Sequence, residues 1–169
     1  GMDGTYCVNL PGPVSLSRDL PASAELYVAF KYRLTTIGSY DRTVISFYNG
    51  ATLLGKLEYG AGGVLKAYRG ITLVGTSAAV ILINTTYLIE IRYLPHATTG
   101  IFQVKINGVL DIDYSGNSGT TADINKITLH GALYLVANFD NVVVDNAAWP
   151  GNTRIQAIVP TGAGASAQW

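Results

Sequence analysis

The stretch IFQVKINGVLDID, residues 101–113, decides the fold class of this chain. Up to Ile106, apolar side chains occupy every second position and polar ones stand between them, which is the period of a strand that buries one side. Asn107-Gly108 accepts the two positive φ angles of a type I′ turn at little cost. The stretch therefore predicts an antiparallel hairpin.

The same alternation recurs along the chain, and we find no comparable helical period. Asn49-Gly50 predicts a second hairpin of the same kind, and the glycine-rich residues 60–63 predict a third. Turn signals spaced about 8–12 residues apart are typical of an all-β sandwich or barrel. The further strands are expected at residues 25–34, 44–48, 53–59, 64–68, 72–75, 80–83, 86–94, 124–130 and 133–144.

Composition excludes several classes of partner. The chain has 169 residues, which suits one domain, and only 13% of them are charged, with a net charge of zero. Without a basic block we expect neither nucleic-acid binding nor membrane insertion, and the aliphatic run 78–83 is too short to span a bilayer. No signal peptide is visible at the start of the sequence. A single cysteine rules out an internal disulfide.

Residues for catalysis are hard to assemble. His96 and His130 are interpreted as surface loop histidines, with no nucleophile pattern beside either. Asp111 and Asp113 lie about 6.8 Å apart along one strand face, but we expect both to point to solvent, where neither pKa would be raised. The chain is therefore predicted not to be an enzyme. A glucanase-like hydrolase that uses these two acids is the catalytic alternative.

Glycan binding has better candidates, because sugar rings stack on aromatic faces and offer hydroxyls to polar side chains. Tyr40, Asp41 and Arg42 stand together in a predicted loop, and Tyr68 and Arg69 stand at a strand end. The competing interpretation is structural, with the tyrosines completing the core and the arginines solvated at its rim.

A metal site is not expected, since no histidines or cysteines have ligand spacing. Asp140-Asn141 interrupts an apolar strand, and we interpret the pair as a bulge or a side-chain cap. The alternative is a Ca²⁺ ligand, which would need oxygens from other loops, because a lone carboxylate binds Ca²⁺ weakly.

The segments TYLIEIRY (86–93) and GIFQVKINGV (100–109) resemble the central hairpins of LamG domains, which have a concanavalin A-like fold. FDNVVVD (139–145) is similar to the closing strand of that family, with Asn141 in place of its second Asp. The resemblance implies a two-sheet antiparallel jelly roll that acts in adhesion, glycan binding or particle decoration. Some members carry Ca²⁺ at the rim, and the change to Asn141 counts against that here.

Residues 150–169 resemble a segment that follows such domains in structural proteins of tailed bacteriophages and prophages, although Asn152 departs from its usual Gly-Asp start. This resemblance implies a virion component, with the jelly roll at 1–160 and a Gly/Ala-rich tail at 161–169. Its partners would be other virion subunits, further copies of itself or a host glycan. The alternative is a carbohydrate-binding module of a bacterial surface or secreted protein.

Overall fold

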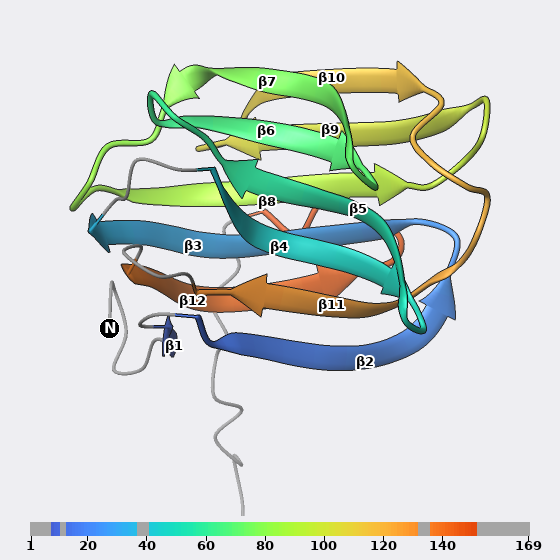
Figure 1. Ribbon diagram of the computed structural model, residues 1–169, viewed down its shortest axis with the longest axis horizontal. Helices are drawn as coiled ribbons and strands as arrows, with labels where there is room; N and C mark the ends of the chain where they lie inside the picture. The colour runs from blue at the N-terminus through green and yellow to red at the C-terminus, as the bar shows by residue number, and fades with distance from the viewer. Residues whose placement is uncertain (1–7, 11–12, 37–40, 132–135, 152–169) are drawn as a thin grey trace, which may run out of the picture.

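The computed structural model describes residues 8–10, 13–36, 41–131 and 136–151, and every regular element in them is a β-strand. The strands form two six-stranded antiparallel sheets that face each other (Figure 1). This confirms the predicted all-β sandwich. The strands are β1 (Val8–Leu10), β2 (Ser15–Ser23), β3 (Leu26–Thr36), β4 (Arg42–Asn49), β5 (Thr52–Tyr59), β6 (Val64–Arg69), β7 (Thr72–Val80), β8 (Thr86–Leu94), β9 (Gly100–Ile106), β10 (Val109–Gly116), β11 (Ile124–His130) and β12 (Val136–Asp145).

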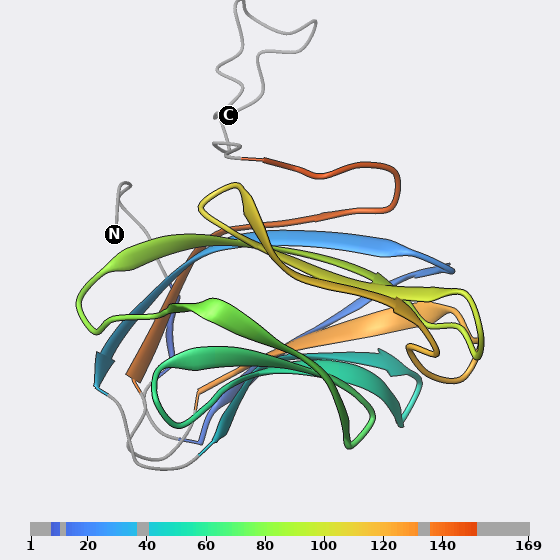
Figure 2. The same ribbon diagram turned by 90° about the horizontal axis from the view of Figure 1, so that it is seen from above.

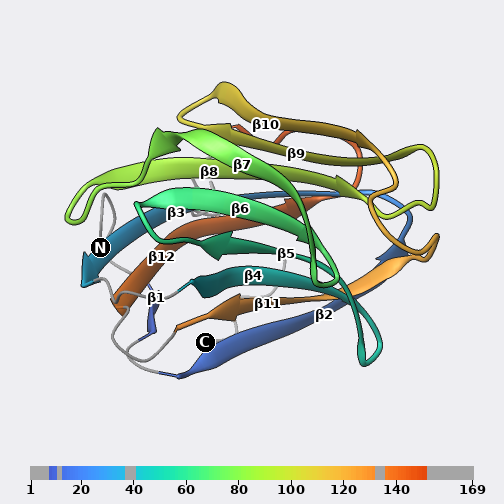
Figure 3. The same ribbon diagram turned by 45° about the horizontal axis from the view of Figure 1, so that its top comes forward.

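Strand order shows how the chain winds between the layers. Sheet A has the order β1-β12-β3-β8-β9-β10, and sheet B has the order β2-β11-β4-β5-β6-β7. The first and last strands pair with each other in sheet A, and the layers are separated in the view of Figure 2. The edge strand β10 of sheet A and the edge strand β7 of sheet B lie side by side on one side of the sandwich, as Figure 3 shows.

The core lies between the sheets and is rich in aromatic rings. Phe47 of sheet B contacts Tyr93 and Phe102 of sheet A, with ring centroids 5.0 and 6.2 Å apart. All three side chains are fully buried. Such rings bury large apolar areas, and tilted or edge-on contacts add stabilisation to that burial. The alternating residues of the predicted strands supply these inward faces.

Turn geometry confirms two of the three hairpins in detail. Asn107 and Gly108 have φ angles of 53° and 83°, as a type I′ turn requires. Residues 60–63 close the hairpin between β5 and β6. The hairpin predicted at Asn49-Gly50 also forms, but Asn49 pairs with Thr52, so the turn residues are Gly50 and Ala51. Only Gly50 has positive φ, at 55°, which is the pattern of a type II′ turn and corrects the predicted geometry.

The predictions lacked the first two strands, β1 and β2, and placed one further strand wrongly. Strand β2 was missed because it is an edge strand with Pro21 inside it and mostly exposed side chains, so it carries no alternation to detect. The separate strand expected at residues 80–83 was wrong. Strand β7 runs on to Val80, and beyond it Ile81 alone is buried while Leu82 and Ile83 are exposed loop residues.

The outer face of sheet A is covered by the segment 146–151, which crosses it after β12 (Figure 2). The Trp149 ring meets the Tyr27 ring edge-on at 5.5 Å, and Lys105 Nζ lies 4.0 Å from the Trp149 centroid. Gly151 donates its amide hydrogen to Glu90 Oε1 at 3.1 Å. These contacts explain why Tyr27 and Glu90 are buried, although both lie on the outer face of sheet A.

The predicted tail at 161–169 lies outside the described residues. None of the described residues forms a helix long and apolar enough to cross a membrane.

Candidate functional site

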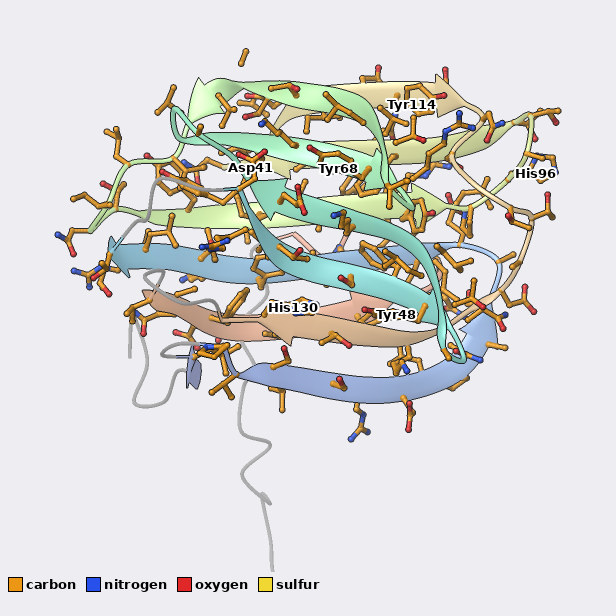
Figure 4. All side chains as sticks on the ribbon, in the orientation of Figure 1. Asp41, Tyr48, Tyr68, His96, Tyr114 and His130 are labelled. Atoms are coloured by element: carbon orange, nitrogen blue, oxygen red, sulfur yellow. The ribbon has the colours of Figure 1, made fainter. Side chains whose placement is uncertain are left out.

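The structure separates the five residues predicted to bind glycan. Tyr40 lies outside the described residues. Asp41 and Arg42 stand at the start of β4, and Tyr68 and Arg69 are the last two residues of β6. Consecutive strand residues point to opposite faces, so Tyr68 lies on the outer face of sheet B and Arg69 turns toward the end of the sandwich. Figure 4 shows Asp41 and Tyr68 on the face nearest the viewer.

On the outer face of sheet B, Asp41 already has protein partners for both carboxylate oxygens. Oδ2 accepts a hydrogen bond from Lys66 Nζ at 2.7 Å, and Oδ1 accepts one from the Ala61 amide at 2.9 Å. The hydrogen bond from Lys66, helped by that of Ala61, holds the pKa of Asp41 below its usual value. Asp41 therefore acts first as an anchor for the turn at residues 60–63.

The two tyrosines on the same face are also engaged. Lys56 Nζ lies 4.9 Å from the Tyr68 centroid, and Lys126 Nζ lies 4.9 Å from the Tyr48 centroid. Lys56 also pairs with Glu58 Oε1 at 2.6 Å. A sugar stacking on either ring would compete with a cation that is already there. This face is a network of mutually satisfied groups.

His130 belongs to that face too, which corrects its interpretation as a surface loop histidine. It ends β11, half-buried, with its ring nitrogens 3.1 Å from Ser15 Oγ and Ser46 Oγ. Burial, reinforced by the nearby charge of Lys56, lowers the pKa of His130. His96 does lie in a loop, where its Nδ1 accepts hydrogen bonds from the amides of Thr98 and Thr99.

Arg69 lies in a different place, an open pocket of about 490 Å³ at one end of the sandwich. We call it the rim pocket. The start of β5 and three connections that are far apart in the sequence build it: β6–β7, β8–β9 and β10–β11, all toward the right-hand end in Figure 1. The lining residues are Thr52, Leu53, Leu54, Arg69, Gly70, Ile71, Thr72, Ala97, Asn117, Gly119 and Thr120.

The polar side chains of the rim pocket are available to a ligand. Asn117 Oδ1 accepts a 3.2 Å hydrogen bond from the Gly119 amide, which leaves the amide hydrogens of its side chain unused. Arg69 and the pocket threonines have no side-chain hydrogen bond or ion pair to any described residue. The rim pocket thus differs from the outer face of sheet B, where the polar groups satisfy one another.

One wall of the pocket is held in place by Ser118, which is fully buried. Its amide donates to His96 O at 3.0 Å, its Oγ accepts from the His96 amide at 3.1 Å, and the same hydroxyl donates to Leu94 O. Tyr93 donates its hydroxyl hydrogen to Ser118 O at 3.0 Å. These bonds tie the β10–β11 connection to β8, so Asn117 and Thr120 are displayed from a fixed loop.

The sequence analysis singled out Arg69, but not Asn117 and Thr120, which line the same pocket, nor their anchor Ser118. The segment 115–121 has the sequence SGNSGTT, which is an ordinary polar turn composition. No local signal separates the buried Ser118 from the exposed pocket residues beside it, because the partners of Ser118 lie 22 to 25 residues earlier in the chain.

Both acids considered for hydrolysis accept hydrogen bonds from other residues of the protein. Asp111 accepts hydrogen bonds from the amides of Ala78 and Ala79 at 2.5 and 3.0 Å, so it joins β10 to β7 across the two sheets. This corrects the expectation that Asp111 points freely to solvent. A register shift beside it, between Leu110 and Ile112, turns its side chain toward those amides. Asp113 accepts from Gln103 Nε2 at 2.7 Å.

Asp140 and Asn141 form the predicted bulge. The register of β12 against β3 shifts after Asp140, and Asn141 has a φ of 51°. Asp140 Oδ1 accepts from the Asn141 amide at 2.8 Å. Among the described residues no three His, Cys, Asp or Glu side chains gather as metal ligands.

No protein-family model matches the sequence, and no curated protein matches it either. Solved structures do. The chain is similar to the cellulose-induced protein Cip1, with TM-score 0.65, 16% identity and coverage of 88% of this chain and 83% of Cip1. It is similar to the carbohydrate-binding module CBM66 from Bacillus subtilis, with TM-score 0.57, 11% identity and coverage of 81% and 85%.

The galectin LEC-6 from Caenorhabditis elegans is also similar, with TM-score 0.53, 14% identity and coverage of 82% of this chain and 95% of the galectin. The chain has a concanavalin A-like jelly-roll fold. It spans only 14% of a sialidase and 62% of an alginate lyase that share the fold. At these identities the similarity establishes the fold alone, and the function of the rim pocket depends on its own residues.

Proposed function

We propose that this jelly-roll domain binds carbohydrate and that the rim pocket is its binding site. The observation that carries the proposal is the contrast in hydrogen bonding. The rim pocket displays an arginine, an asparagine and three threonines whose donors no described residue uses. Such groups are suited to the hydroxyls of a sugar, which present a donor and an acceptor at each carbon.

The shape and apolar surface of the pocket support the same proposal. A volume of about 490 Å³ is in the range of pockets that hold small ligands, about 300–1,000 Å³. Ile71 is 88% exposed at the pocket edge. An aliphatic side chain in that position offers the C–H face of a sugar ring a contact surface. The carbohydrate-binding module and the galectin named above add weight to this choice of ligand class.

We propose further that the domain binds without catalysis. Each acid considered has a protein partner: Asp111 accepts hydrogen bonds from two amides of β7, and Asp113 accepts one from Gln103 Nε2 at 2.7 Å. Neither carboxyl lines the rim pocket. A general acid must stand beside the scissile bond, and this arrangement supplies none there.

The virion role inferred from residues 150–169 stays a prediction, because residues 152–169 lie outside the described ones. The same holds for virion or self-association partners and for location in a phage particle. A virion adhesin and a bacterial carbohydrate-binding module would both use a glycan pocket, so the proposed activity is compatible with either setting.

A glycan array tests the proposal. The purified chain is compared with Thr120→Trp, which fills the rim pocket, and with Thr76→Trp, which places the same bulk on an exposed strand position of sheet B. We expect the wild type and Thr76→Trp to bind a common set of glycans and Thr120→Trp to lose them. No binding by the wild type, or full binding by Thr120→Trp, would contradict the proposal.

A further inference from the structure

We propose that the rim pocket selects acidic glycans, with the Arg69 guanidinium receiving a carboxylate carried by one sugar unit. This inference rests on the proposed function and names the ligand class of the same site. Arg69 is the charged residue among those that line the pocket, so the pocket carries one positive charge without a counter-charge in its wall.

Three cations elsewhere in the described residues have an acidic partner, and Arg69 has none. Lys56 is paired with Glu58, Lys66 with Asp41 and Arg92 with Glu25, each at 2.6 to 2.7 Å. No described carboxylate lies within ion-pair distance of Arg69. The chain has 11 basic and 11 acidic residues, so the positive charge of the pocket is local and is not an effect of net charge.

The position of Arg69 favours a carboxylate over a diffuse anionic surface. Its backbone is held in the ladder between Gly55 of β5 and Thr72 of β7, at the last residue of β6. A guanidinium on a fixed backbone presents two parallel N–H donors, which match the two oxygens of a carboxylate. Thr72 and Asn117 stand in the same pocket for the neighbouring ring hydroxyls.

The expected loss of affinity follows from the charge-assisted hydrogen bond between Arg69 and the sugar carboxylate. Loss of a charge-assisted hydrogen bond weakens binding by about 10- to 100-fold. Because one charge is involved and the chain has no net charge, we expect only a shallow dependence of affinity on salt, unlike that of a basic face that binds polyanions.

The experiment uses oligosaccharides that end in galacturonate, glucuronate, mannuronate or a sialic acid, each printed beside its carboxyl methyl ester. The ester keeps the ring and removes the charge. The variants are Arg69→Gln, Arg69→Lys and the matched control Arg18→Gln, which removes the charge of an exposed arginine on β2. Folding of each variant is checked by thermal unfolding.

We expect the wild type and Arg18→Gln to prefer at least one acid over its ester by about tenfold or more, and Arg69→Gln to lose that preference. Arg69→Lys should keep part of it, because it retains the charge and loses the paired donors. Binding of acids and esters alike, or a preference that survives Arg69→Gln, overturns the acidic selectivity while glycan binding stands. If no glycan of either class binds, the proposed function fails as well.

Discussion

Tyr93 donates its hydroxyl hydrogen to the backbone carbonyl of Ser118 over 3.0 Å, from a ring that is buried in the core. A strand of sheet A thereby supports the loop that forms one wall of the rim pocket. The same ring lies against β5, where a Cβ added at Gly55 would come within 2.7 Å of it. The Tyr93 side chain therefore connects the core to the wall of the pocket.

Removal of that hydroxyl should weaken both stability and binding. In Tyr93→Phe the carbonyl of Ser118 loses its donor in a buried setting, which costs about 1–3 kcal/mol of unfolding free energy. Glycan affinity should fall with it, because Asn117 and Thr120 lose their fixed loop. Urea unfolding and array binding measure the two effects, and unchanged values for both would show that the contact is unimportant.

Tyr32 provides the matched comparison. Its side chain is also fully buried, and no described residue makes a hydrogen bond with its hydroxyl. Burial raises the pKa of this tyrosine far above its usual value. Tyr32→Phe removes an unsatisfied polar group and should leave the free energy of unfolding unchanged or raise it by about 1 kcal/mol. A loss as large as that of Tyr93→Phe would mean that the hydroxyl has a partner.

Gly100→Ala should disrupt the loop anchor directly. A Cβ at this position would come within 1.8 Å of Ser118 Oγ and 2.8 Å of Leu94 O, which is backbone and cannot move aside alone. We expect a loss of about 2–4 kcal/mol, in the range of overpacked cores and broken buried hydrogen bonds. Thermal unfolding checks this value, and a melting temperature equal to that of the wild type would contradict the account.

Trp149→Ala tests whether the segment 146–151 stabilises sheet A. The substitution removes the ring contact with Tyr27 and the cation–π contact with Lys105. We expect a loss of about 1–3 kcal/mol in urea unfolding with glycan binding retained, because the segment lies away from the rim pocket. A loss of binding without loss of stability would place the ligand on the wrong face.

His130 should make stability depend on pH. Its pKa is lowered in the folded state, so between that value and the unfolded value of about 6.5 the unfolded chain binds more protons. The contribution of neutral His130 to stability is therefore fully present above about pH 6.5, and it is lost as the pH falls toward the folded pKa. His130→Gln should remove this part of the loss between about pH 7.5 and 5.5. Parallel curves for the two proteins would exclude the effect.

The sequence predicts the strands far better than the site, for a physical reason. The alternation around Phe102 and Val104 and the Asn107-Gly108 turn are local, so they are visible in a short window. Strand β2 carries no such alternation, because an edge strand buries little. Arg69 could be selected by type, but its separation from Asp41 and its meeting with Asn117 depend on strand register and on loops that converge only in the folded chain.

The central claim is that sugar binds at the rim pocket rather than on the outer face of sheet B. An amide chemical-shift titration of the labelled protein, with the strongest ligand from the array, tests it most directly. We predict shifts concentrated at residues 52–54, 69–72 and 117–120, with Lys56, Lys66 and Lys126 unmoved. Shifts centred on those three lysines and on Tyr68, or no saturable shifts at all, would contradict the claim.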